Sequence, residues 1–220
     1  DFRTKVIALA KGLVAAGIQP GQAVAIMSRT RFEWTLLDFA IWYAGAVSVP
    51  IYESSAPAQM EWILSDSDSV ALFVENDEHL ARFEQIKAGA PLIRNVWKIE
   101  SDAIDQLVKV GRDIGDDVIE GKRKSAKLGD LATIIYTSGT TGEPNGVLHT
   151  SNTLFSNIRP FSERQGLSAS DIILMPSPLA HQLGFLYGLM MPIYLQTTAV
   201  LQDTWDPLYA VKVAAAEKPT

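Results

Sequence analysis

The sequence predicts an α/β fold, in which helices flank a layered and mostly parallel β-sheet. Short apolar runs alternate with amphipathic segments along the first half of the chain, and this alternation is typical of parallel strands joined by crossover helices. The chain has 220 residues, of which 47% are hydrophobic and 20% charged. This composition excludes disorder as the main state, because so much apolar surface can offset the entropy of folding.

The elements of the first half follow from apolar spacing. Phe2, Val6 and Leu9 recur at helical intervals and predict a first helix, which Gly17 and Pro20 end. Compact apolar runs predict buried strands, and the longer segments between them predict helices. In chain order these are a strand at Ala23–Met27, an aromatic-rich helix at Phe32–Ala44, a strand at Val47–Tyr52, a helix at Pro57–Leu64 with proline in its first turn, a strand at Val70–Val74, a helix at Asp77–Lys87 and a strand at Val96–Ile99.

Several aromatic and histidine side chains on these elements have expected places. Trp34, Trp42 and Trp62 lie on apolar helical faces, so we expect them in the core. His79 lies in a charged helix, and we expect it in solvent.

The segment from Asp102 to Ala126 is polar and carries charges of both signs, which predicts an exposed helix and connector. Its Lys122-Arg123-Lys124 cluster follows acidic residues, and the whole chain has 19 basic against 25 acidic residues, a net charge of −6. A nucleic-acid binder would instead gather basic residues on one face. We therefore expect no nucleic-acid partner.

The run from Ile172 to Gln202 contains no Asp, Glu, Lys or Arg. Such a run is compatible with a membrane span or with a buried strand–helix–strand unit. Pro176, Pro178 and Pro192 interrupt it, and its flanks are acidic, so we favour the buried unit and expect no transmembrane segment.

The most unusual segment is Tyr136–Gly146, which follows an apolar strand at Leu131–Tyr136. It places three glycines and four Ser or Thr side chains within eleven residues. Glycines let the backbone approach a ligand closely, consecutive N–H groups form an anion site, and a hydroxyl can bind Mg²⁺. These are the parts of a loop that holds a polyphosphate.

Other phosphate motifs do not fit this segment. A Walker loop needs Gly-Lys-Ser/Thr after its first glycine and four further residues, but Pro144 stands five positions after Gly139. No Gly-x-Gly-x-x-Gly occurs in the chain, so the dinucleotide fingerprint is absent. A kinase of the Walker type is therefore disfavoured, and a simple Gly/Thr hairpin turn would not need so many small residues together.

The segment resembles the phosphate loop of the adenylate-forming superfamily, the AMP-binding enzymes that include acyl-CoA synthetases. The family pattern, Tyr-Thr/Ser-Ser-Gly-Thr-Thr-Gly-x-Pro-Lys-Gly, is matched from Thr137 to Gly142, at Pro144 and at Gly146. Pro178-Leu179-Ala180-His181 is similar to the second motif of the family. The flanking segments look like the N-terminal part of a fatty-acid CoA ligase of the mycobacterial type, and the fold should resemble the N-terminal subdomain of these enzymes.

The resemblance implies roles for particular residues. Thr137 would approach Mg²⁺, and His181 would act at the junction of ATP and the acyl group. Phe185, Tyr187 and Met190 either line an acyl pocket or pack in the core, and His149 has a structural role. The residues expected to bind the nucleotide phosphates are Thr137, Ser138, Gly139, Thr140, Thr141, Gly142 and Asn145.

The chain departs from the family at two points. Asn145 stands where the family usually has Lys, which removes a positive charge near the leaving pyrophosphate. The family's Gly-Tyr-Gly-x-Thr-Glu and Thr-Gly-Asp segments do not occur. We therefore expect residues 1–127 to form the first α/β part of the AMP-binding N-terminal domain and 128–220 its phosphate-loop and acyl-pocket part, with the remainder of the enzyme outside this chain.

The function implied is that of an ATP-dependent ligase, which activates a fatty or alicyclic carboxylic acid as acyl-AMP and transfers it to coenzyme A. ATP, Mg²⁺ and coenzyme A are the implied cofactors. The chain has no cysteine, which such chemistry does not need. A non-catalytic remnant or interaction module with the same fold is the alternative. We expect a cytoplasmic location, with peripheral membrane contact as a variant, little activity of the chain alone, and self-association.

Overall fold

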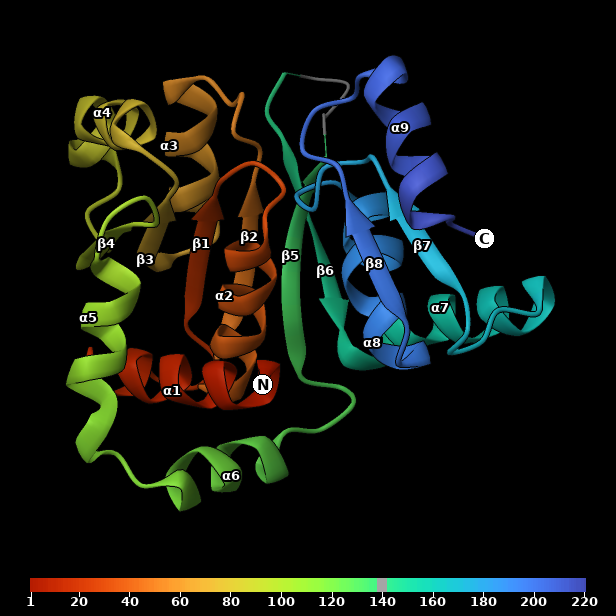
Figure 1. Ribbon diagram of the computed structural model, residues 1–220. Helices are drawn as coiled ribbons and strands as arrows, with labels where there is room; N and C mark the ends of the chain where they lie inside the picture. Colours follow the sequence, from red (N-terminus) through yellow and green to blue (C-terminus); the bar gives the residue numbers. More distant parts are fainter. Residues whose placement is uncertain (138–141) are drawn as a thin grey trace.

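Two β-sheets organise the molecule (Figure 1). The computed structural model describes residues 1–137 and 142–220. The strands are β1 (Ala23–Met27), β2 (Val47–Ile51), β3 (Ser69–Val74), β4 (Asn95–Lys98), β5 (Leu131–Thr137), β6 (Asn145–Thr150), β7 (Ile172–Met175) and β8 (Thr198–Leu201). The first six form one sheet in the order β4-β3-β1-β2-β5-β6, and β7 and β8 form a parallel pair.

Helices cover both faces of the larger sheet. They are α1 (Phe2–Ala15), α2 (Phe32–Tyr43), α3 (Pro57–Asp66), α4 (Asp77–Ile86), α5 (Ala103–Val110), α6 (Asp116–Ser125), α7 (Ser151–Gln165), α8 (Met191–Leu195) and α9 (Pro207–Glu217), with 3-10 turns at Lys87–Gly89 and Gly111–Asp113 and a π-helix at Gly184–Met190. One apolar cluster joins α1 and α2 to one face of the sheet. A second cluster joins α3 and α4 to the other face. The fold is therefore three-layered.

Burial on both faces explains why the central strands could be predicted. Every residue of β1, β2 and β3 is buried. Within the large sheet each neighbouring pair is parallel except β5 and β6, which form an antiparallel hairpin. The expected layered and mostly parallel α/β fold is confirmed.

The uncharged run from Ile172 to Gln202 forms β7, the π-helix, α8 and β8 in turn. The expected strand–helix–strand order is present, and the side chains of the π-helix are mostly buried, but β7 and β8 are only partly buried. No helix among the described residues is both long and apolar enough to cross a membrane.

Two expectations about burial are wrong. Trp62 on α3 is 38% exposed, whereas Trp34 is fully buried as expected and Trp42 is half-buried. Trp62 lies beside the β5–β6 hairpin, where its indole N–H donates a hydrogen bond to a backbone carbonyl oxygen. His79 is only 4% exposed, because the first turn of α4 rests against the sheet. Burial lowers the pKa of His79, and the nearby Arg82 lowers it further.

Candidate phosphate-binding site

The candidate site lies where the parallel strands of the large sheet end. β1, β2, β3 and β5 run in the same direction, so their carboxyl ends meet at one edge of the sheet (Figure 1). The residues at or just after these ends are Ser28, Tyr52, Glu75 and Thr137. Ligands of open α/β sheets bind at this edge, so its side chains are the first candidates for function.

The hairpin of β5 and β6 carries the predicted phosphate loop. Thr137 and Asn145 are register partners at the end of the hairpin where residues 138–144 connect its two strands, and both are exposed. Gly142 has a φ of +107°, a conformation that side chains disfavour and glycine adopts freely. Ser138, Gly139, Thr140 and Thr141 lie outside the described residues. The structure thus brings Thr137 and Asn145, two of the residues expected to bind phosphate, opposite each other on the hairpin.

His181 lies in the turn between β7 and the π-helix and is exposed. Its Nδ1 accepts a hydrogen bond from the backbone N–H of Leu183 at 3.1 Å. In the neutral imidazole the proton is then on Nε2, which is a donor. The ring lies against Tyr52, with 6.4 Å between the ring centroids. Because Tyr52 follows β2, and β2 pairs with β5, His181 is at the same edge of the sheet as the hairpin end.

A buried hydrogen bond connects the His181 turn to the large sheet. The backbone N–H of Leu179 donates to Oγ1 of Thr30 at 3.1 Å, and Thr30 is 6% exposed. Thr30 belongs to the connection between β1 and α2. This hydrogen bond therefore holds the turn that carries His181 at the carboxyl edge of the large sheet, close to the end of β1.

An ion pair fills the point where the connections after β1 and β3 diverge. Glu75 is 2% exposed and accepts from the backbone N–H of Arg29 at 2.7 Å, and the Arg29 guanidinium donates to it at 3.2 Å. Burial alone would raise the pKa of Glu75, but these hydrogen bonds and the charge of Arg29 outweigh it and lower that pKa. Open sheets of this kind often bind ligands at such a point, and here protein side chains occupy it.

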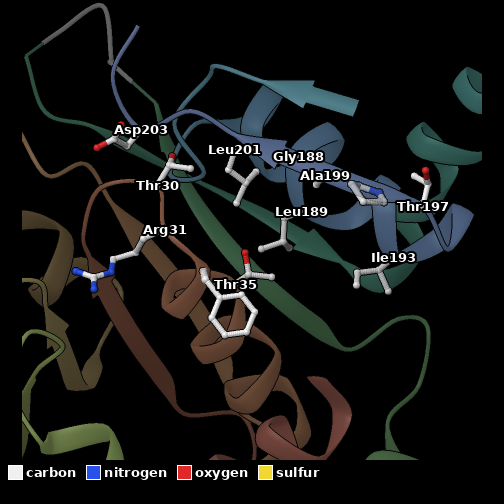
Figure 2. A pocket seen from close by; sticks show the side chains of 12 residues that line it. Thr30, Arg31, Thr35, Gly188, Leu189, Ile193, Thr197, Ala199, Leu201 and Asp203 are labelled. Carbon is white, nitrogen blue, oxygen red and sulfur yellow. The ribbon is translucent and has the colours of Figure 1, made fainter. Parts of the chain in front are cut away.

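A cavity of about 470 Å³ lies between the start of α2 and the unit formed by the π-helix, α8 and β8 (Figure 2). Leu189, Ile193 and Leu201 give it an apolar side, and Arg31 stands at its rim. The Arg31 guanidinium already contacts Glu33 at 2.8 Å and Glu100 at 3.4 Å. Because Arg31 is paired in this way, the cavity offers a carboxylate ligand little free positive charge.

The aromatic residues considered for an acyl pocket pack in other ways. Phe185 is fully buried, edge-on to Trp34 and Trp42 at centroid distances of 6.2 and 6.0 Å. The hydroxyl of Tyr187 donates to Asn157 on α7 at 2.8 Å. The sequence left open whether these residues line an acyl pocket or pack in the core. Phe185 and Met190 pack in the core.

The family model described as AMP-binding enzyme matches residues 1–220. The chain belongs to the AMP-binding enzyme family. Relatives of this AMP-binding chain include the long-chain-fatty-acid–CoA ligase FadD15 of Mycobacterium tuberculosis, 38% identical over 192 residues, which cover 83% of this chain and 31% of that protein. The medium-chain fatty-acid–CoA ligase of Escherichia coli is 27% identical over 90% of this chain and 36% of its own length.

Solved structures of other proteins have the same fold. The N-terminal domain of FACL13 from Mycobacterium tuberculosis superposes with a TM-score of 0.84 at 24% identity, over 99% of this chain and 53% of that one. A long-chain-fatty-acid-CoA ligase from Archaeoglobus fulgidus gives 0.85 at 22% identity, over 98% and 42%. The AMP-binding chain therefore spans about a third of the length of the curated relatives named above.

Sequence reasoning on this AMP-binding chain missed two residues of the edge. Tyr52 contacts His181, and Thr30 anchors the turn that carries it. Tyr52 is the last residue of the predicted strand Val47–Tyr52, and Thr30 lies three residues after the predicted strand Ala23–Met27, so the carboxyl ends of these strands were the signal available in the sequence. Sequence spacing does not show whether the His181 turn packs against β7 or against the large sheet, because this depends on tertiary contacts.

Proposed function

We propose that the full-length protein containing this chain is an AMP-forming acyl-CoA ligase. The observation that carries the proposal is the glycine- and hydroxyl-rich segment from Tyr136 to Gly146, whose described ends close a hairpin at the carboxyl edge of the sheet. Membership of the AMP-binding family and 38% identity to FadD15 support it.

The proposed reaction has two steps. The carboxylate of the acid attacks the α-phosphorus of ATP, and pyrophosphate leaves with the electrons of the broken P–O bond. The thiol of coenzyme A, after losing its proton, then attacks the acyl carbon and releases AMP. The rate depends on positioning and on neutralising phosphate charge, not on a protein nucleophile. A chain without cysteine suits this chemistry.

Each candidate residue has a place in this reaction. The backbone of residues 138–142 binds the phosphates, and Asn145 donates neutral hydrogen bonds beside the leaving pyrophosphate. Nε2 of His181 donates to the acyl or phosphate oxygens where the two substrates meet, with Tyr52 fixing the ring. This assignment is supported by the shared sheet edge and by the hydrogen bond that orients the imidazole.

Mg²⁺ fits this arrangement through one protein oxygen. The exposed Thr137 hydroxyl, at the end of β5, offers a neutral ligand. Among residues 1–137 and 142–220, no three His, Asp or Glu side chains are close enough together to hold a metal ion. Mg²⁺ commonly keeps phosphate and water ligands and takes few from protein. The bound ion would neutralise charge on the phosphates.

The substrates we propose are ATP, coenzyme A and a fatty or alicyclic carboxylic acid, in the cytoplasm or at a membrane surface. The mycobacterial FadD15 proteins named for long-chain fatty acids support a fatty acid as the first to try. The test is pyrophosphate exchange and acyl-CoA formation by the full-length protein over a series of acids. Absence of exchange with every acid, from folded protein and MgATP, would contradict the proposal.

A non-catalytic protein of the same fold is the second candidate, and Asn145 favours it. The loss of Lys from an otherwise matching segment removes a charge that transition-state stabilisation would use. MgATP binding without exchange in the full-length protein would favour this candidate over the ligase.

A further inference from the structure

We propose that α3 holds the stem of the phosphate-loop hairpin, so that Trp62 and Asp66 are positioning residues for nucleotide binding. The hairpin stem consists of Tyr136 and Thr137 on β5, Asn145 and Gly146 on β6, and Pro144 directly before β6. The inference rests on the proposed function for its kinetic consequence, but not for its geometry.

Each side of the hairpin stem is bonded to α3. The indole N–H of Trp62 donates to the carbonyl oxygen of Pro144 at 2.9 Å. The hydroxyl of Tyr136 donates to Oδ2 of Asp66 at 2.6 Å. Trp62 and Asp66 are four residues apart, so they lie on the same face of the helix, one turn from each other.

These contacts reach the residues next to the proposed ligands. Tyr136 directly precedes Thr137, and Pro144 directly precedes Asn145. Since Thr137 and Asn145 are register partners, the two hydrogen bonds fix both strands at the end of the hairpin next to its connecting segment. Loss of either hydrogen bond would therefore displace Thr137 or Asn145, the proposed nucleotide-binding residues, although neither residue is itself replaced.

Gly146 makes room for the Tyr136 side chain. A Cβ added at Gly146 would lie 3.1 Å from Cζ and 3.3 Å from Cε1 of Tyr136. The tyrosine ring thus passes close over its register partner and continues to Asp66. This explains why the segment ends in glycine. Burial raises the pKa of the Tyr136 phenol, and the hydrogen bond to the Asp66 carboxylate raises it further. The phenol therefore stays protonated and remains a hydrogen-bond donor.

Exposure separates the Trp62 contact from ordinary core packing, whereas Tyr136 belongs to the core cluster on that face of the sheet. Tyr136 is 6% exposed, but Trp62 is 38% exposed. A tryptophan kept at a half-open position with its N–H on a loop carbonyl contributes less to the core than a buried one, so its replacement tests positioning more than stability.

The first experiment measures steady-state kinetics of the full-length protein. Trp62→Phe removes the donor and keeps an aromatic ring, and Asp66→Ala removes the acceptor. Each should raise KM for ATP roughly threefold to tenfold, the effect of losing one hydrogen bond, while KM for the fatty acid stays near its original value. Asp66→Asn retains an acceptor oxygen and should restore most of the loss.

The matched control is Trp97→Phe, the same chemical change on β4 at the opposite edge of the sheet. It should leave KM for ATP unchanged. Tyr136→Phe combined with Asp66→Ala should raise KM no more than either change alone, because both remove the same hydrogen bond. The inference would be overturned if the α3 variants lowered kcat and raised KM equally for ATP and for the fatty acid, and if Trp97→Phe had the same effects.

The second experiment needs no catalytic activity. Amide hydrogen exchange of the full-length protein should become roughly threefold to tenfold faster at the hairpin stem in Trp62→Phe and Asp66→Ala, with β1 and β2 unchanged. Unchanged exchange at the stem would overturn the inference even if the protein proves to be a ligase. Faster exchange in a protein without ATP turnover would support the α3 contacts while contradicting the proposed function.

Discussion

Asn145 stands opposite Thr137 at the end of the hairpin next to its connecting segment, with its side chain in solvent. In the full-length protein, Asn145→Lys should lower KM for ATP or speed pyrophosphate exchange by up to about tenfold, because a charged hydrogen bond contributes about 1 kcal/mol more than a neutral one. Exchange of ³²P-labelled pyrophosphate into ATP measures this directly.

The control for this change is Asn145→Gln, which lengthens the side chain without adding charge. It should not accelerate exchange. If Lys and Gln have the same effect, or if Lys slows exchange, a cation elsewhere in the protein already serves the leaving pyrophosphate.

Asp38 is a buried carboxyl group on α2 that the proposed reaction does not use. It is fully buried, and neither of its oxygens has a hydrogen-bond partner among the residues that the structure describes. Burial raises its pKa from 3.8 to about 7, although a nearby Ser48 hydroxyl favours the ionised form. The folded protein therefore binds a proton that the unfolded chain releases between these values.

Because the folded pKa is the higher one, this proton stabilises the fold below about pH 4, and that stability is lost as pH rises towards 7 and above. Asp38→Asn, which is neutral at every pH, should therefore be more stable than the wild type at pH 8 by roughly 2–4 kcal/mol. The difference should shrink as pH falls. Urea unfolding at several pH values gives both curves.

The same change at Asp113, an exposed carboxylate, should leave the pH dependence of unfolding as in the wild type. Parallel stability curves for Asp38→Asn and the wild type would mean that water or a rearranged hydroxyl solvates the buried carboxyl group.

Single residues were predictable where their neighbours in sequence decide their surroundings. The family pattern at Thr137 and Gly142 predicted a phosphate loop after the strand at Leu131–Tyr136, but it did not predict that β5 and β6 flank this segment as a hairpin. His79 and Trp62 were misplaced, because burial at these positions depends on contacts with distant elements. A charged helix can still bury one histidine in its first turn, and an apolar helix can leave a tryptophan at its edge for a backbone partner.

At the scale of elements, the π-helix that follows His181 depends on close contact with the turn before it. A Cβ added at Gly184 would lie 2.1 Å from the carbonyl oxygen of Pro178, which is backbone and cannot move aside easily. Gly184→Ala should therefore lower the free energy of unfolding by about 1–3 kcal/mol and displace the turn that carries His181. Chemical denaturation measures the first effect and pyrophosphate exchange the second.

Gly121 provides the matched control, since a Cβ there would meet nothing within 4 Å and the residue is in α6. Gly121→Ala should raise the free energy of unfolding by about 0.5–1 kcal/mol, as expected for a helix interior. Equal stability for the two alanine variants would show that the π-helix moves away from Pro178 at little cost.

Elements were predictable in proportion to how uniformly they are buried. The three central strands are apolar throughout because helices cover both of their faces, so their boundaries could be predicted to within a residue or two. β6 is an edge strand whose first four residues are exposed, and its sequence has no strand pattern of its own. The π-helix has no sequence signature, since it arises from packing against β7 and the adjoining turn.

At the scale of the whole molecule, large apolar side chains gather in the solvent at two places. On β6, Leu148 is 64% exposed, and near α9, Trp205, Leu208 and Val211 are 61%, 76% and 68% exposed. The chain covers 31% of the length of FadD15 from Mycobacterium tuberculosis. Patches of this kind promote association in isolation.

The isolated 220-residue chain should therefore self-associate and make neither acyl-adenylate nor acyl-CoA at a useful rate. In the proposed function Thr137, Asn145 and His181 would supply phosphate and acyl contacts, but the family segments for adenine, ribose and the catalytic lysine do not occur in this sequence. Without them ATP is held by its phosphates alone, and effective molarity requires both reactants to be fixed. Light scattering and pyrophosphate release test the two parts. Turnover by monomeric chain comparable to that of a complete ligase, abolished by Gly142→Asp, would contradict both.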